Sequence, residues 1–237
     1  MSHEQVAPGR PAPMVVQPAT LTGRSVRLEP LARQHLPDLR VAGLGEPGVF
    51  RWYIDPVTTA GELEAWSSAA LAEAAQRSSL PFATIDRATG RAVGSSRYLN
   101  IDAVHHRLEI GSTWLAPWLR GTGHNSEAKL LQLDHAFGVL GAIRVEFKTD
   151  SRNEPSRAAL LAIGATFEGI FRHHMIVADG RHRHSAYYSI VAQEWPEVRR
   201  LLTARLERQL AGRAASRGDQ GGRSGDLEDA VTDLSSR

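Results

Sequence analysis

Alternating apolar and polar positions predict most of the strands of this chain. Over residues 25–31, Val26 and Leu28 alternate with polar side chains, as expected of a strand with one buried face. Residues 87–90 end in glycine and predict a turn that joins two strands into a hairpin. The further predicted strands are residues 81–86, 92–100, 107–115, 142–149, 167–178 and 184–191.

Apolar residues at helical spacing predict five helices, of which residues 126–140 form the clearest. The core face of this helix is predicted to consist of Leu130, Leu133, Phe137 and Leu140. Asn125 is the expected N-cap, and Glu127 in the first turn suits the positive end of the helix dipole. The other predicted helices are residues 35–43, 60–77, 155–163 and 195–210.

The resulting element order is β-α-α-β-β-β-α-β-α-β-β-α. Short connections make the second, third and fourth strands antiparallel, whereas the helix at residues 126–140 crosses to a strand parallel to the one before it. The order predicts an α+β fold with a mixed, mostly antiparallel central sheet flanked by helices. It fills a single domain over residues 21–211, between a disordered leader at 1–20 and a disordered tail at 212–237, both of which lack periodicity.

Composition excludes several classes of protein. The chain contains no cysteine, so disulfides, thiolate nucleophiles and cysteine metal sites are ruled out. No apolar run approaches the roughly 18 residues of a membrane span, and the N-terminus lacks a signal pattern, which makes the cytoplasm the expected location. The net charge of +2 argues against a dedicated nucleic-acid binder. Lysine occurs only at Lys129 and Lys148, a bias that codon composition can produce.

A glycine-bearing loop carries the strongest chemical signal. Arg120-Gly121-Thr122-Gly123-His124-Asn125 lies between a predicted strand and a predicted helix. Glycines at such a turn let backbone N–H groups converge, and the helix start adds unpaired donors and a positive dipole end. This geometry binds phosphate oxygens without a metal. The loop lacks the third glycine of the dinucleotide fingerprint and the Gly-Lys-Ser/Thr of a Walker loop.

A second block strengthens this signal. It runs Asp150-Ser151-Arg152-Asn153-Glu154-Pro155-Ser156-Arg157 and is followed by Gly164-Ala165. With both blocks in this order, residues 21–210 resemble the GCN5-related N-acetyltransferases (GNAT), and more narrowly the RimJ/RimL type. The resemblance implies the GNAT fold, acetyl-CoA as co-substrate, and a primary amine as acceptor on a protein, a peptide or a small molecule. It also implies direct attack of the amine on the thioester, which the absence of cysteine fits.

The resemblance implies roles for individual residues in binding the co-substrate. Backbone N–H groups of the glycine loop would hold the diphosphate, and Asn125 stands where the family usually has a small residue. Arg120 would be an ionic partner of the diphosphate or, alternatively, a solvated surface arginine. Asn153 would contact the CoA arm or order the strand–helix junction. The implied co-substrate residues are Thr113, Trp114, Leu115, Arg120, Gly121, Thr122, Gly123, His124, Asn125 and Asn153.

The resemblance also implies two catalytic residues. Glu109 stands in a strand where some acetyltransferases carry a catalytic base, which must remove a proton because an ammonium cannot attack a carbonyl. The alternative for Glu109 is an ion pair with Arg107 or Arg97. The tyrosine by which many members protonate the leaving thiolate falls on Leu160, so Ser156 is the candidate for that task. Its alternative is a hydroxyl bonded back to its own helix.

Other interpretations stay open. Arg97, Arg172 and His182 could accept the carboxylate of a succinyl or similar acyl group. The missing tyrosine also fits an inactive CoA-binding regulatory module. The aromatic residues Phe50, Trp52 and Tyr53 belong to the core or, alternatively, to a wall of the acceptor site. Neither the acceptor nor the oligomeric state follows from the sequence, which is compatible with a homodimer.

No metal site, membrane contact or nucleic-acid partner is expected. Histidines occur in pairs at 105–106 and 173–174 and at positions 182 and 184, but no carboxylate accompanies them at a metal-site spacing. Adjacent residues on a strand point to opposite faces, so His173 and His174 cannot both face one ion. The tail carries arginines that could contact nucleic acid, but its acidic residues largely cancel their charge.

Overall fold

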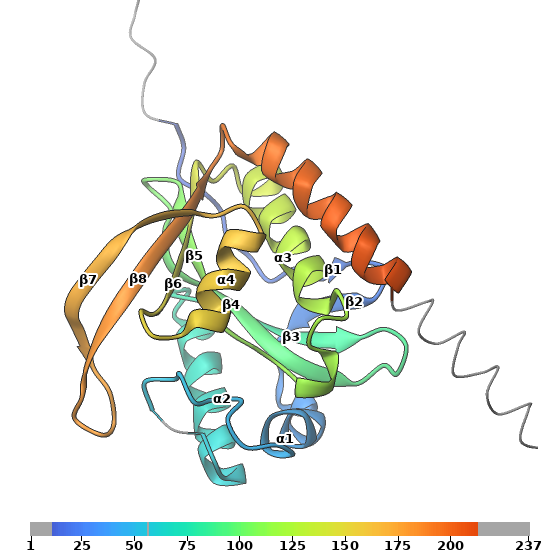
Figure 1. The fold of residues 1–237 in the computed structure, drawn as a ribbon, viewed down its shortest axis with the longest axis vertical. Coiled ribbons are helices and arrows are strands. Elements are labelled where there is room, and N and C mark those ends of the chain that lie inside the picture. Colours follow the sequence, from blue (N-terminus) through green and yellow to red (C-terminus); the bar gives the residue numbers. More distant parts are fainter. Residues whose placement is uncertain (1–10, 56, 213–237) are drawn as a thin grey trace, which may run out of the picture.

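The computed structural model describes residues 11–55 and 57–212 and contains one eight-stranded sheet (Figure 1). The strand order is β1-β2-β3-β4-β5-β6-β8-β7. The strands are β1 (Leu21–Thr22), β2 (Val26–Pro30), β3 (Leu80–Asp86), β4 (Ala92–Asp102), β5 (Arg107–Leu115), β6 (Arg144–Asp150), β7 (Thr166–Ile176) and β8 (His182–Val191). The helices are α1 (Leu36–Leu44), α2 (Ala60–Ala75), α3 (His124–Asp134), α4 (Glu154–Ala162) and a C-terminal helix over residues 195–212. The predicted α+β fold is confirmed.

The pairing of the strands follows the predicted connections. All neighbours are antiparallel except β5 and β6, which run parallel on either side of α3 in the chain. The parallel pairing covers only three residue pairs, from Arg107↔Arg144 to Glu109↔Glu146. Both strands then continue, β5 to Leu115 and β6 to Asp150, without pairing to each other. The sheet is therefore split in its middle, and each strand leads from the split into a helix.

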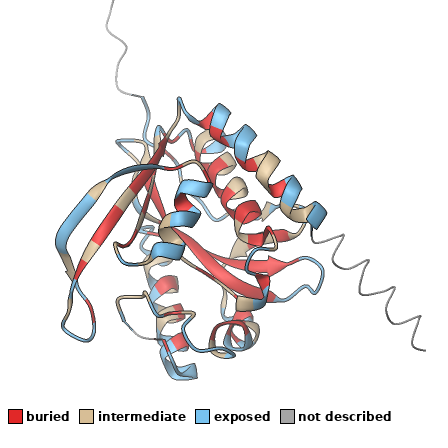
Figure 2. Ribbon diagram, viewed as in Figure 1, coloured by how far each residue is buried: buried red, intermediate tan, exposed pale blue. Residues whose placement is uncertain are grey.

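Helices cover the two faces of the sheet with two separate apolar clusters. On one face, α3, α4 and the C-terminal helix pack on strand residues such as Phe82, Tyr98 and Val145. On the other face, α1, α2 and the loop between them pack on residues such as Ile85 and Trp114. Figure 2 shows the buried strands in the middle of the molecule, whereas β7 at one edge is largely exposed. The split between β5 and β6 thus lies between two helical layers.

The structure describes only part of the expected leader and of the expected tail. Residues 1–10 of the expected leader and 213–237 of the expected tail lie outside the described residues. Within residues 11–20, Met14 is buried and its backbone N–H donates to the carbonyl of Ala103 (2.9 Å). The two-residue strand β1 pairs with β2 and is too short to leave a periodic signal. The domain limits at residues 21 and 211 stay a prediction.

The start of α3 corrects one prediction. Asn125 is not the N-cap; Gly123 occupies that position in a left-handed conformation (φ 93°), and its carbonyl accepts the backbone N–H of Glu127 at 2.9 Å. The helix therefore begins earlier than the apolar pattern indicates, and Asn125 lies inside its first turn. A π-helical turn, His135–Val139, continues α3.

The buried face of α3 is also more polar than expected. Leu133 and Leu140 are buried, whereas Leu130 and Phe137 are only partly so. The residues of α3 that are buried despite being polar or charged are His124, Ser126, Glu127, Lys129 and Gln132. Buried polar side chains need hydrogen-bond partners, so this face has tasks besides core packing. Within the described residues, no helix is long and apolar enough to span a lipid bilayer.

Candidate active site

The candidate site lies where β5 and β6 separate. One extra residue in β5 forms a bulge there, because Arg97 pairs with Gly111 whereas Ser95 pairs with Trp114. Ser112 within the bulge has a positive φ of 47°. A bulge bends its strand and redirects its side chains, and bulges are common beside active sites. The unpaired edge of β5 beyond Glu109 thus faces the split with its backbone groups available to a ligand.

The glycine loop forms the turn at the start of α3. Gly121 and Gly123 both have positive φ values, 75° and 93°, which a side chain would disfavour. Thr122 donates two hydrogen bonds to the carbonyl of Leu119, from its backbone N–H at 3.3 Å and from its side-chain hydroxyl at 2.6 Å. These bonds close the turn. The first N–H groups of α3 have no acceptor inside the helix. The loop therefore has the shape of an anion-binding helix start, as predicted.

Buried side chains fix this loop to the sheet. His124 is fully buried and bridges the hydroxyl of Thr122 (Nδ1 to Oγ1, 2.8 Å) and the carboxylate of Asp86 (Nε2 to Oδ1, 3.3 Å). Burial alone would raise the pKa of Asp86, but hydrogen bonds from Ala88, Thr89 and His124 lower it overall. The carboxylate is therefore a fixed anchor on the β3–β4 turn. His124 thus contributes its side chain to holding the loop in place.

Glu127 fixes the same turn from its other side. Its buried carboxylate accepts the backbone N–H groups of Arg24, Ser25 and Val26 at 2.5, 2.7 and 3.0 Å. The predicted favourable placement of an acid in the first turn of the helix is observed. Its main contacts, however, are to the loop between β1 and β2. The start of α3 is thus held to both β2 and β3.

Glu109 lies next to the split, on the sheet face that α1 and α2 cover. Only 3% of the residue is exposed, and its Oε2 accepts the amide of Asn100 at 2.8 Å and lies 3.3 Å from Nζ of Lys148. Its Oε1 lies beside Gly111, where a Cβ atom would stand only 2.8 Å from that oxygen. Glu109 is therefore ion-paired, as the alternative interpretation has it, but to Lys148 on β6 instead of the arginines considered.

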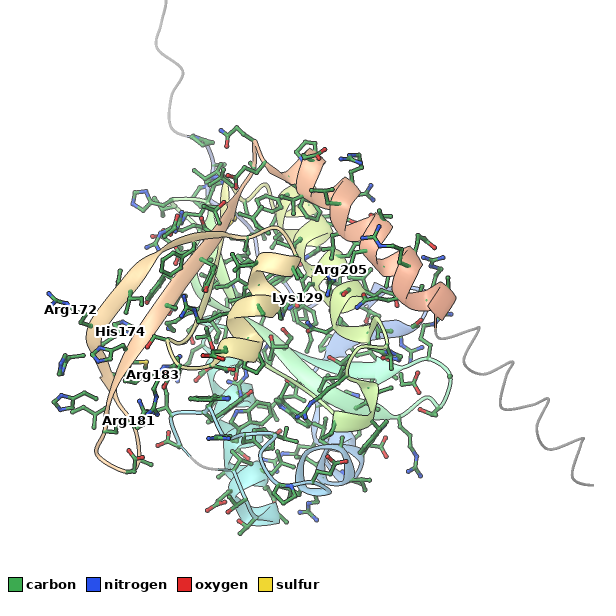
Figure 3. The ribbon with its side chains drawn as sticks, viewed as in Figure 1. Lys129, Arg172, His174, Arg181, Arg183 and Arg205 are labelled. Atoms are coloured by element: carbon green, nitrogen blue, oxygen red, sulfur yellow. The ribbon has the colours of Figure 1, made fainter. Side chains whose placement is uncertain are left out.

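Lys129 of α3, labelled in Figure 3, lies on the opposite face of the same strands, where it contacts Ser96 and Thr113. Its ammonium donates to the hydroxyls of Thr113 (2.8 Å) and Ser96 (3.1 Å) and to the amide oxygen of Gln132 (3.3 Å). All three partners are uncharged, and burial lowers the pKa of Lys129 to about 7. Thr113, predicted to bind co-substrate through its backbone, is thereby held by α3 through its side chain.

Arg97 on β4 lies on the Glu109 face and is buried under aromatic rings. Its guanidinium stacks on Trp66 at 4.4 Å from the ring centroid, and its Nη1 lies 3.3 Å from the half-exposed carboxylate of Glu73. Burial lowers the pKa of Arg97. Its Nε and Nη2 are buried and have no hydrogen-bond partner among the described residues. Trp66 belongs to an aromatic cluster with Phe50, Tyr53 and Trp114.

Of the early aromatic residues, Phe50 belongs to the core, and a place for Trp52 and Tyr53 in the wall of the acceptor site stays a prediction. Phe50 is buried in the core, whereas the hydroxyl of Tyr53 lies 3.5 Å from that of Ser112 in the bulge. Trp52 lies 5.8 Å from the guanidinium of Arg152, which precedes α4. The backbone of Ala178, in the β7–β8 turn, donates to the carbonyl of Ile54 at 3.1 Å. The α1–α2 loop thus reaches across the split to both neighbouring segments.

The second sequence block lies at the start of α4. Asn153 is the N-cap, and its side chain accepts the backbone N–H of Ser156 at 3.2 Å. This bond confirms that Asn153 orders the strand–helix junction, while a contact with the CoA arm stays a prediction. The hydroxyl of Ser156 makes no hydrogen bond to any described residue, so it is not bonded back to its helix. Among the described residues, no hydrogen bond or ion pair joins Glu109 to Ser156.

The remaining predicted residues are placed as follows. Trp114 is buried in the aromatic cluster and Leu115 pairs with Gly94, and the contact of their backbones with the co-substrate stays a prediction. Arg120 is exposed at the loop and makes no ion pair within the described residues, which leaves its phosphate role a prediction. His173 contacts His182 whereas His174 contacts Ser185, so the two adjacent histidines do diverge. The described residues contain no cluster of three or more potential metal ligands.

The contacts of Asn100, Lys129, Lys148 and Asp86 are not predicted by the sequence. The two lysines left a signal in the composition, because a chain that uses arginine almost throughout keeps lysine at two positions only. Both positions adjoin the split between β5 and β6. Asn100 and Asp86 left no such signal, because only the strand register brings them to Glu109 and His124.

Comparisons with known proteins agree with this arrangement. Residues 25–166 match the family model described as an acetyltransferase (GNAT) domain. A GCN5-related N-acetyltransferase from Brucella melitensis is 36% identical with a TM-score of 0.76, covering 82% of this chain and 89% of its own. A putative acetyltransferase from T. thermophilus is 37% identical with a TM-score of 0.73, covering 81% and 100%.

A third similar structure contains a ligand. Mycobacterium smegmatis RimJ in complex with CoA-disulfide is 26% identical with a TM-score of 0.68, covering 79% of this chain and 94% of its own. No curated protein sequence matches the chain.

Proposed function

The chain belongs to the GNAT acetyltransferase family, and from this membership we propose that it transfers an acyl group, acetyl in the simplest case, from acyl-CoA to a primary amine. The observation that carries the proposal is the split between β5 and β6 in front of the glycine loop of α3. A backbone edge and an anion-binding helix start then lie side by side, which suits a ligand with an amide-bearing arm and a diphosphate.

The residues that bind acyl-CoA lie in the glycine loop and on β5. Backbone N–H groups at Gly121, Gly123, His124 and Asn125 hold the diphosphate, while that of Thr122 closes the turn on the carbonyl of Leu119. Arg120 adds a charge from the surface. The backbone of Thr113, Trp114 and Leu115 pairs with the CoA arm. The bridges from His124 to Asp86 and from Glu127 to β2 support this role, because they fix the loop before the ligand arrives.

Glu109 is the base of the proposed reaction. Its Oε2 is held by Asn100 and Lys148, which leaves Oε1, beside Gly111, to take a proton from the amine directly or through water. An α-amine with a pKa near 8 needs about 1.4 kcal/mol to lose its proton at pH 7, against about 4.6 kcal/mol for a lysine amine. A carboxylate base therefore serves an α-amine more easily, which agrees with the RimJ/RimL type.

The leaving thiolate takes a proton from Ser156 or from water that Ser156 orients. Support comes from the place of its hydroxyl at the start of α4, with no bond to any described residue. The acceptor is the N-terminal α-amine of a protein or peptide, or a small-molecule amine. Similarity to the RimJ structure with CoA-disulfide supports the donor.

Two measurements test the proposal. Calorimetry with CoA and acetyl-CoA reports donor binding, and release of free thiol with a panel of peptides, polyamines and amino acids reports transfer. Binding with thiol release above blank is the expected outcome. Absence of both contradicts the proposal, whereas binding without release for any acyl donor and acceptor favours an inactive CoA-binding module.

A further inference from the structure

The guanidinium of Arg97 is incompletely paired in a buried place. Nη1 is close to Glu73, but Nε and Nη2 have no partner among the described residues, and the residue is only 5% exposed. Buried polar groups are almost always hydrogen-bonded, and an unpaired buried charge is costly. The stack on Trp66 gives the guanidinium a flat apolar neighbour but accepts none of its hydrogens in the ring plane.

The two unpaired nitrogens lie on the same edge of the guanidinium. Nε–H and an N–H of Nη2 point in parallel, and their spacing matches the two oxygens of a carboxylate. Lysine cannot reproduce this geometry, because its ammonium is a single point charge. The unpaired edge of Arg97 therefore has the chemistry of a carboxylate receptor.

Strand register places Arg97 near the proposed base. Arg97 on β4 is directly opposite Gly111 on β5, and Leu99 is opposite Glu109. Arg97 and Glu109 are thus diagonal neighbours on one face, with Cβ atoms about 7–8 Å apart. Gly111 adds no side chain between them; a Cβ there would stand 2.8 Å from Oε1 of Glu109 and 3.1 Å from Cδ1 of Leu99. An amine beside Glu109 and a carboxylate beside Arg97 then fit within one small group.

The charges around the site favour an anionic substrate. Arg97, Lys148 and Arg183 are buried or nearly so on this face. Glu73 pairs with Arg97 and Glu109 with Lys148, whereas Asp150 is the acid that acts most strongly on Arg183, ahead of Glu109. Asp150 is already engaged by Arg181 and Arg152. Arg183 has a buried Nε without a partner among the described residues, as Arg97 has. A substrate carboxylate would balance this surplus of positive charge.

We propose that Arg97 binds a carboxylate of one of the two substrates through its Nε–Nη2 edge. This inference rests on the proposed acyl transfer and names its substrate class. The carboxylate belongs either to the acceptor, as in an amino acid or a peptide that begins with an acidic residue, or to the acyl group of a dicarboxylic acyl-CoA. Arg172 and His182, the other cations considered for such a group, are exposed and show no comparable unpaired buried edge.

The test compares thiol release by the wild type, Arg97→Gln and a matched control, Arg91→Gln, which changes an exposed arginine at the β3–β4 turn. One arm pairs acetyl-CoA with peptides that begin with Asp or Asn and with glycine or glycinamide. The other pairs acetyl-CoA and succinyl-CoA with an uncharged amine. In one arm we expect the carboxylate substrate to be preferred and Arg97→Gln to lower its kcat/KM about 10- to 100-fold, mainly through KM. The kcat/KM of Arg97→Gln for the uncharged substrate should equal that of the wild type. The kcat/KM of Arg91→Gln should be unchanged for both substrates.

Two outcomes overturn the inference while transfer itself stands. The wild type releases thiol without preferring a carboxylate in either arm, or Arg97→Gln lowers all substrates equally, as a purely structural arginine would. Arg97→Lys keeps the charge and is the second variant if Arg97→Gln does not fold; it should lose most of the preference because it lacks the paired donors.

A binding measurement decides the case in which no thiol is released and the proposed function fails. Succinate and aspartate, used as probes, should raise the melting temperature of the wild type and of Arg91→Gln but not that of Arg97→Gln. Equal shifts, or none in the wild type at millimolar concentrations, overturn the assignment of Arg97.

Discussion

The two lysines of the chain lie on opposite faces of the split sheet and in opposite electrical surroundings. Lys148 on β6 faces the side of α1 and α2 and lies 3.3 Å from the carboxylate of Glu109. Lys129 on α3 faces the other side and donates only to hydroxyl and amide oxygens. An arginine in place of Lys148 could also pair with Glu109. At position 129, burial favours the neutral side chain, and a lysine can lose its proton there whereas an arginine cannot.

The two faces of the sheet therefore have different functions. On the Glu109 face, the buried charges are either ion-paired, as Glu109 is with Lys148, or partly unpaired, as Arg97 is. Such charges suit a site that transfers protons and binds ionic substrates. On the α3 face, the buried side chains of His124, Glu127 and Lys129 are hydrogen-bonded to strands and loops, although Nε2 of Gln132 has no partner among the described residues. The bonded groups suit a scaffold that fixes the glycine loop and the bulge of β5. Changes on the first face should therefore alter catalysis, and changes on the second should alter stability and donor affinity.

The largest expected effect comes from Glu109→Gln. The amide keeps the size of the side chain but cannot take a proton, so kcat should fall about 10²- to 10⁴-fold. Calorimetry should show unchanged CoA binding, since the donor loop is untouched. The matched control is Glu146→Gln, which changes the residue opposite Glu109 in register and should keep activity within about 3-fold. Equal activity of Glu109→Gln and the wild type contradicts the role of Glu109.

The next effect concerns the pH dependence of stability. The pKa of Lys129 is about 7 in the folded protein and near 10.5 in the unfolded chain. Between these values the unfolded chain holds a proton that the folded protein lacks, so the free energy of unfolding should rise with pH, by up to about 1.4 kcal/mol per unit. Below pH 7 both states are protonated and the gain is absent.

Lys129→Met should remove this slope, whereas Lys148→Met should keep it. Urea denaturation of the three proteins between pH 6.5 and 9.5 measures the difference. A slope that survives in Lys129→Met would show that another group causes it, and the contrast between the two lysines would then lose its basis.

A smaller effect is expected at the start of α3. Gly123→Ala places a Cβ on a residue with φ 93° and 3.3 Å from Leu206 of the C-terminal helix. The left-handed conformation should reduce the free energy of unfolding by about 1–2 kcal/mol. Acetyl-CoA should also bind more weakly, because the loop N–H groups shift. Gly180→Ala, also left-handed but in the β7–β8 turn, is the control: it should cost similar stability without loss of CoA binding.

The smallest effect is expected for Arg120→Gln. An exposed arginine interacts with a bound diphosphate through solvent, so CoA affinity should fall only about 2- to 5-fold at low salt and less at high salt. Calorimetry at two ionic strengths measures this difference, with Arg91→Gln as the matched control. A loss that persists unchanged at high salt would mean that Arg120 contacts the ligand at close range.

The sequence predicts the fold well because most elements have a periodic apolar face. The predicted limits of β5, residues 107–115, are those observed, and those of β3, β4 and α4 differ by one or two residues. Periodicity fails where other forces decide. The left-handed glycine, not the side chain of Asn125, starts α3, and β1 exists only because β2 offers it an edge.

The site is predictable only as far as it depends on the backbone. The positions of the glycine loop and of the strand before it are predicted correctly, because each depends on residues that are consecutive in the sequence. The partners of Glu109 come from β4 and β6, and a register shift between Leu99 and Asp102 of β4 lies beside Asn100. A sequence without a register cannot show that Asn100, rather than Arg107, reaches Glu109.

The early end of β5–β6 pairing has a consequence for the handling of the ligand-free protein. Besides the outer edges formed by β1 and β7, the sheet exposes an inner edge along β5 beyond Glu109. Unsatisfied strand edges are templates for pairing with any extended chain, including that of a neighbouring molecule. An occupied split hides this template, so the empty protein should be the more prone to aggregate, and adding CoA during purification should keep it monodisperse.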